Sequence, residues 1–198
     1  RRLAGRSRRA VILQLPGGPA HSDFRLAKLL DAVRAAVPGV RAIASRYLHL
    51  VDCATPLSDA ERERLVALLT YGPRYTGGEP TGQWLVVAPR QGTTSPWSSK
   101  ATDIAQVCEL PQVRRIERGV RFHFEAGPLT QAQLTAAGAV LHDRMTESVL
   151  LDEAGIAALF DHGQPQPLRR VARDVLSLKA ANAELGLALS GDEIEYLT

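Results

Sequence analysis

Pro128-Leu129-Thr130-Gln131-Ala132-Gln133 repeats, seventy-two residues further along the chain, the pattern of Pro56-Leu57-Ser58-Asp59-Ala60-Glu61. In each segment a hydroxyl residue stands three positions before a Glu or Gln, which is the spacing of a helix-capping box. The hydroxyl accepts a hydrogen bond from a free N–H of the first turn, and the longer side chain accepts one from the capping residue. We therefore expect a helix after each box, the first one reaching about Leu69.

The segments that precede the two boxes also correspond. Ile12–Leu15 matches Trp84–Val87, Val40–Ile43 matches Val113–Ile116, and His49-Leu50 matches His123-Phe124, always with an offset of 72 to 74 residues. A constant offset across several elements indicates an internal duplication. The sequence thus predicts an α/β fold, an α+β sandwich of two pseudo-repeated strand–helix–strand–helix halves, followed by a mostly helical linker segment. The Gly- and Pro-rich segment 71–82 is expected to join the halves.

Local patterns predict the remaining elements of the first half and the end of the second. The expected elements are a strand over 10–15 ended by Pro16-Gly17-Gly18-Pro19, a helix from Asp23 capped by Ser22, a long strand over 40–53, a strand over 147–151 and a short helix over 152–160.

The chain divides into four expected parts: a basic arm (1–9), the duplicated domain (10–151), a connector (152–168) and the start of a helical linker domain (169–198). Apolar residues at helical spacing predict a helix over 169–185, with Gly186 as its C-terminal cap. Ser190 and Glu193 form a third capping box. Because the helix that this box begins meets no stop signal before Thr198, we expect the linker domain to be truncated here.

The net charge of +3 comes from the N-terminal arm, which carries five arginines in residues 1–9. Of the 24 Lys and Arg, 19 remain for the rest of the chain, against 21 Asp and Glu. The body of the protein is therefore not expected to bind a polyanion, although the arm alone could tether nucleic acid. No run of eighteen apolar residues is present, and the arm lacks the apolar core of a secretory signal.

Residues capable of metal binding or catalysis are few and scattered. Cys53 and Cys108 are far apart and form no C-x-x-C pattern, which favours reduced, buried thiols in a cytoplasmic protein. The five histidines, His21, His49, His123, His142 and His162, show no metal-ligand spacing. No nucleophile elbow, P-loop or dinucleotide-binding glycine pattern is present. The residues themselves thus predict no catalytic, cofactor-binding or metal site.

The stretch Gln91–Ile104, with the sequence QGTTSPWSSKATDI, has the character of a strand-to-helix turn. Gly92 frees the backbone and Pro96 sets φ. We expect Ser98 or Ser99 to cap the following helix, Lys100 to lie beside its first turn, and Trp97 to be buried.

The run Thr94–Ile104 within this stretch resembles the N-terminal region of the large, single-chain type of phosphoribosylformylglycinamidine synthase. The segments Arg115–Gly119, Leu141–Glu147 and Leu185–Leu197 fit the same family, so the resemblance spans nearly the whole chain. It implies an N-terminal domain similar to a fused dimer of the small accessory subunit of the multi-subunit enzyme. It also implies an enzyme of purine biosynthesis that uses ATP, Mg²⁺ and glutamine to amidate formylglycinamide ribonucleotide.

In that family the glutaminase nucleophile and the ATP-binding residues lie in later domains, so the resemblance implies a scaffold that encloses part of the ammonia path. Its partners would be the synthase and glutaminase domains of the same chain, without nucleic acid or membrane. We hypothesise that the interdomain interface comprises Ser95, Pro96, Trp97, Ser98, Ser99, Lys100, Thr102, Asp103, His142, Asp143 and Arg144. Two alternatives remain open: a free-standing duplicated α/β module that binds a small molecule at its central groove, and nucleic-acid binding through the arm.

Overall fold

The computed structural model describes residues 11–161 and 170–198. The first unit contains β1 (Val11–Pro19), α1 (Asp23–Ala36), β2 (Ala42–Cys53), α2 (Asp59–Leu69), β3 (Gln83–Pro89), α3 (Pro96–Val107), β4 (Val113–Glu125), α4 (Gln131–Leu141), β5 (Glu147–Leu150) and α5 (Glu153–Ala158). A second compact unit carries α6 (Val175–Leu185) and α7 (Gly191–Leu197). The expected arm over 1–9 and residues 162–168 of the expected connector, with His162, lie outside the described residues.

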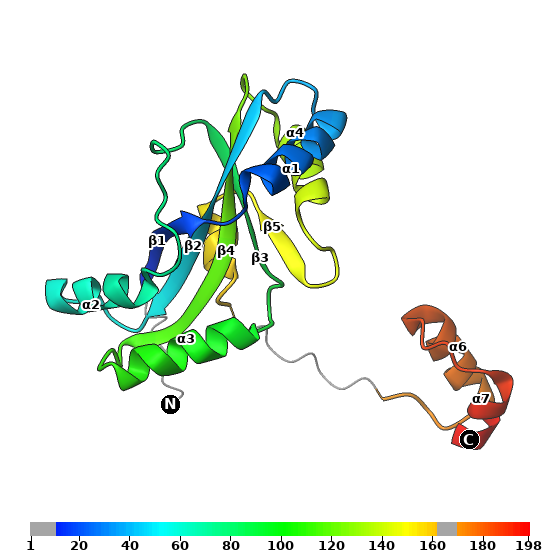
Figure 1. Cartoon of the computed structure of the whole chain (residues 1–198). Helices are drawn as coiled ribbons and strands as arrows, with labels where there is room; N and C mark the ends of the chain where they lie inside the picture. Colours follow the sequence, from blue (N-terminus) through cyan, green and yellow to red (C-terminus); the bar gives the residue numbers. More distant parts are fainter. Residues whose placement is uncertain (1–10, 162–169) are drawn as a thin grey trace. The chain divides into compact units, whose positions relative to one another are not determined.

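The first unit is built on one antiparallel sheet of five strands in the order β1-β2-β4-β3-β5. The two long strands β2 and β4 pair at its centre, where Tyr47 lies opposite Val120. Figure 1 shows these strands side by side, with α1 and α4 toward one end and α2 and α3 toward the other. The order β1-β2-β4-β3 is symmetric about the β2–β4 pair, so the predicted strand–helix–strand–helix halves are confirmed.

Side chains alternate between the two faces of a strand, and this alternation assigns the buried residues to three apolar clusters. On one face, α1 and α4 cover Leu85 and Phe122, while α2 and α3 cover Val51 and Ile116. The opposite face is covered in part by α5 and the residue that follows it: Ile156 and Leu159 pack on Leu48, Leu50 and Val86. The result is a sheet with four helices on one face and one short helix on the other.

The expected helix caps at Ser22, Ser58, Thr130, Gly186 and Ser190 are confirmed. Ser58 and Thr130 each accept a hydrogen bond from the backbone N–H three residues on, and both capping boxes are complete. Ser22 caps α1, Ser190 with Glu193 forms the box of α7, and Gly186 ends α6 in the left-handed conformation.

Two predicted boundaries and one predicted correspondence were wrong. β1 continues through the Pro-Gly-Gly-Pro segment to Pro19, with a register shift between Pro16 and Pro19, because an edge strand tolerates proline and glycine. The helix expected from residue 169 begins at Val175, where Asp174 caps it. His49 and His123 both lie in strands, but the pairing register places them on opposite faces of the sheet, so their positions do not correspond.

Replacing Thr130 by Ala should lower the free energy of unfolding by roughly 1 kcal/mol, because the first turn of α4 loses its side-chain acceptor. Thr130→Ser keeps the hydroxyl and should leave stability nearly unchanged. Urea unfolding followed by circular dichroism measures both. Equal losses in the two variants would show that packing of the threonine methyl group, not the cap, stabilises this helix.

Candidate functional site

The stretch that carries the family resemblance folds mainly as α3, which begins earlier than expected. Ser95, not Ser98 or Ser99, is the N-terminal cap: its Oγ accepts a hydrogen bond from Ser98 N at 3.0 Å. Pro96 occupies the first turn, where a missing N–H costs nothing. The prediction failed because a Ser-Pro pair is itself a helix start, so the residues after it already belong to the helix.

The orientation of α3 also differs from the expected one. Trp97 is half-buried, Ser98 is fully buried and Lys100 is exposed. The apolar side chains of Ile104 and Val107 are 45% and 84% exposed. Instead the small Ala105 is buried against the sheet.

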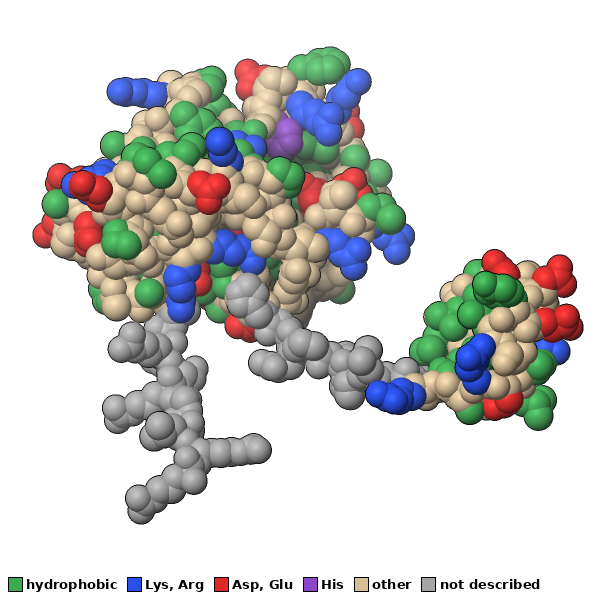
Figure 2. Space-filling model, turned by 90° about the horizontal axis from the view of Figure 1, so that it is seen from below, with side chains coloured by type: hydrophobic (Ala, Val, Ile, Leu, Met, Phe, Trp, Pro, Cys, Tyr) green, Lys and Arg blue, Asp and Glu red, His purple; other side chains and the backbone are tan. Residues whose placement is uncertain are grey.

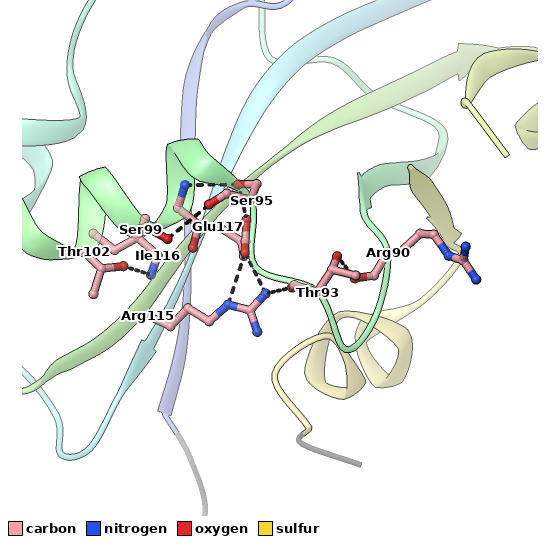
Figure 3. Close-up of polar contacts among 9 residues, drawn as sticks. Arg90, Thr93, Ser95, Ser99, Thr102, Arg115, Ile116 and Glu117 are labelled. Atoms are coloured by element: carbon pink, nitrogen blue, oxygen red, sulfur yellow. Dashed lines mark hydrogen bonds and ion pairs between the residues drawn. The ribbon is translucent and has the colours of Figure 1, made fainter. Parts of the chain in front are cut away.

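A buried ion pair ties the start of α3 to β4. Glu117 is fully buried and lies 2.6 Å from Arg115, whose side chain is 12% exposed. Ser95 Oγ donates to the second carboxylate oxygen of Glu117 at 3.1 Å, and Arg115 Nη2 donates to the carbonyl of Thr93 at 2.5 Å. Figure 3 shows that these contacts draw the 90–95 loop and the cap of α3 onto the strand. Buried charges are tolerated when they are paired and hydrogen-bonded, and this pair meets both conditions.

Thr102 holds the next turn of α3 against the same strand. Its Oγ1 accepts a hydrogen bond from Ile116 N at 3.0 Å, at a position where β4 extends beyond its pairing with β3 (Figure 3). The helix thereby satisfies an edge N–H that would otherwise need water. Ser95 and Thr102 thus both bond to β4.

His142, Asp143 and Arg144 form the turn between α4 and β5. His142 Nδ1 lies 2.6 Å from the carbonyl oxygen of Gly138, and Asp143 accepts from Met145 N. The 90–95 loop contacts both this turn and the α3 region, because Arg90 N donates to the carbonyl of Thr146 at 3.1 Å. The two predicted interface segments are therefore connected through this loop.

A groove of about 620 Å³ lies beside the first turns of α3. It is lined by Ile12, Asp52, Thr94, Ser98, Ser99, Thr102, Asp103, Arg114, Arg115, Ala157, Phe160 and Asp161. Four of these residues, Ser98, Ser99, Thr102 and Asp103, belong to the predicted interdomain interface. Ser98 Oγ is buried at the groove without a hydrogen-bond partner among the described residues. On the face in Figure 2, acidic, basic and apolar side chains are interspersed, and no single kind covers it.

A second polar cluster lies on the helical face of the sheet, behind α3. The His49 ring stacks on Trp97 with centroids 5.7 Å apart, and His49 Nε2 lies 2.8 Å from the hydroxyl of Tyr71. Arg118 donates to the same hydroxyl and lies over the rings of Trp97 and Tyr47. No spacing rule predicted this cluster, because its members come from α3, two strands and the loop after α2.

The described residues contain no group of three His, Cys, Asp or Glu side chains placed to hold a metal ion. Cys53 is buried, and burial raises the pKa of its thiol to about 11. Cys108 is only partly buried, contrary to the prediction. No helix among the described residues is long and apolar enough to cross a membrane.

These features define an internally duplicated α/β domain whose distinctive surface is the start of α3 with the loop before it. Residues 46–160 match the family model described as the N-terminal domain of formylglycinamide ribonucleotide amidotransferase. The chain belongs to this family. It is therefore part of an amidotransferase of purine biosynthesis, and the resemblance noted in the sequence is confirmed.

Two of the structurally central residues had no predicted role. Glu117 and Arg115 stand in the quoted Arg115–Gly119 segment, but their pairing was not foreseen. The available signal was an acidic residue flanked by arginines in a strand whose neighbours are apolar, since such an acid needs a partner when it is buried.

Replacing Arg115 by Gln should cost about 3 kcal/mol or more of stability, because Glu117 would remain buried without its ion partner. Arg41→Gln is the matched control: Arg41 pairs with Glu125, and both side chains are mostly exposed, so the loss should stay within about 1 kcal/mol. Denaturant unfolding compares the two. Similar losses would mean that water reaches Glu117.

Acid should weaken the fold through His49. Burial, and then the neighbouring Arg118, lower the pKa of His49 from 6.5 to about 4. The unfolded chain therefore binds a proton that the folded chain excludes as pH falls from 6.5 to about 4. Stability should drop over this window by up to about 3 kcal/mol and be insensitive to His49 above it. Urea unfolding of the parent and His49→Gln across this range measures the difference; superimposable pH profiles would refute it.

Proposed function

We propose that this domain acts as an interdomain scaffold in the amidotransferase and forms part of the enclosure through which ammonia passes. The observation that carries the proposal is the buried Glu117–Arg115 pair, which fixes the cap of α3 and the 90–95 loop while Ser99, Lys100 and Asp103 stay exposed. A surface held rigidly from behind and presented outward suits docking of another domain, since little conformational freedom is lost on binding.

The groove beside α3 supports the second part of the proposal. Ser98, Ser99, Thr94 and Thr102 supply hydroxyl groups, which can exchange hydrogen bonds with ammonia without protonating it. Ammonia that meets bulk water becomes ammonium and loses its nucleophilicity, so the path must be closed by contact between domains. In this proposal the chain itself contributes no catalytic group, and ATP, Mg²⁺ and glutamine bind to other domains of the parent enzyme.

The test is made in the parent enzyme with Asp103→Ala and Ser99→Ala, which alter the exposed side of α3. We expect glutamine hydrolysis to continue while product per glutamine consumed falls several-fold, because ammonia escapes at a loosened contact. The matched control is Asp31→Ala, since Asp31 occupies the corresponding exposed position on α1, seventy-two residues earlier. Unchanged coupling in both α3 variants would refute the scaffold role.

A further inference from the structure

A cavity of about 230 Å³ lies between α2 and α3. It is lined by Leu68, Leu69, Tyr71, Trp97, Lys100, Ala101, Ile104, Ala105 and Ile116. The corresponding helices at the other end of the sheet, α1 and α4, pack against each other (Figure 1). The two halves therefore differ at this place, although they share their strand and cap pattern.

Small side chains on α3 account for the difference. Leu29 and Val33 line the inner side of α1, and Val33 is fully buried. Seventy-two residues later, at the offset of the two capping boxes, stand Ala101 and Ala105. Each replacement removes branched apolar volume, and closely packed helices do not collapse fully onto such a gap. The cavity thus results from divergence of the second half.

The lining of the cavity is apolar except for Lys100 and the hydroxyl of Tyr71. The Tyr71 hydroxyl is already hydrogen-bonded to His49 and Arg118. Lys100 is the one charged residue of the lining; it is exposed, and no ion pair joins it to another described residue. An apolar chamber with one unpaired ammonium group beside it selects an apolar molecule that carries a single negative charge.

We propose that this cavity binds a small aromatic or branched aliphatic carboxylate, with the apolar part against Trp97 and Ala101 and the carboxylate on Lys100. An apolar cavity of about 150 Å³ suffices for benzene. The additional volume here accommodates a short acidic side arm that reaches the lysine. The site is separate from the hydroxyl-lined groove, but Trp97 and Lys100 also belong to the predicted interdomain interface. The test below therefore uses this chain alone, where no other domain competes for them.

The test uses the 198-residue chain with Trp84→Phe, which leaves Trp97 as the sole tryptophan. Titration with 3-phenylpropionate should change Trp97 fluorescence with saturation. The neutral analogue 3-phenylpropanol should bind about tenfold more weakly, since a charge-assisted contact contributes roughly that factor. In Lys100→Gln the acid and the alcohol should bind equally.

Ala101→Leu restores the residue type found on α1 and should abolish binding by filling the cavity. Its urea midpoint should equal or exceed that of the parent, which shows that lost binding is not lost folding; Ala105→Val provides the same test if Ala101→Leu folds poorly. Three results would each overturn the proposal: no saturable change with 3-phenylpropionate, equal affinity for acid and alcohol in the parent, or unchanged affinity in a folded cavity-filling variant. A fourth result would also overturn it: the 198-residue chain does not bind 3-phenylpropionate, and Ala101→Leu uncouples glutamine hydrolysis from product formation in the parent enzyme. The cavity would then receive a side chain of another domain instead of a small carboxylate.

Discussion

The antiparallel pairing of β2 with β4 is the constraint on which the rest of the domain depends. Tyr47 faces Val120, seventy-three residues later, so the centre of this ladder coincides with the centre of the duplication. The corresponding residues Ile43 and Ile116 each pair with the opposite strand, with Phe124 and Val51. One hydrogen-bonded ladder thereby closes both halves into a single sheet, which neither half could cover alone. The four helices then share one face because each follows or precedes a strand of this ladder.

The halves diverge where the domain presents its distinctive surface. β5 pairs with β3, whereas no strand among the described residues pairs with the outer edge of β1. On α1 the inner residues are large, and α1 packs on α4. On α3 they are small, and Thr102 and the Ser95 cap instead bond to β4. The duplication thus placed α1 and α3 at equivalent positions. The inner side of α1 packs in the core, whereas the start of α3 forms polar contacts with β4 and an exposed surface.

The elements whose causes are local could be predicted from the sequence. Ser58 and Thr130 were found because a cap needs only its own next three residues. The duplication also followed from spacing alone. By contrast, the sequence did not show which side of α3 meets the sheet: Ala105 is buried there, whereas the larger Ile104 and Val107 are exposed. His49 and His123 were matched because both are histidines at a similar offset. The pairing register places them on opposite faces of the sheet, since a shift of one residue along a strand moves a side chain to the other face.

The sequence by itself determined the repeated strand–helix–strand–helix order, the positions of the capping boxes and the family, because these depend on residue types at short or constant separations. Only the tertiary structure decided that Glu117 is buried against Arg115 and Ser95, that Trp97 stacks on His49, and that Ala101 and Ala105 leave a cavity. These contacts join residues that are distant in the chain or depend on which face a side chain occupies. The strength of these contacts depends on how deeply the residues are buried, and the spacing of residues along the sequence does not show burial.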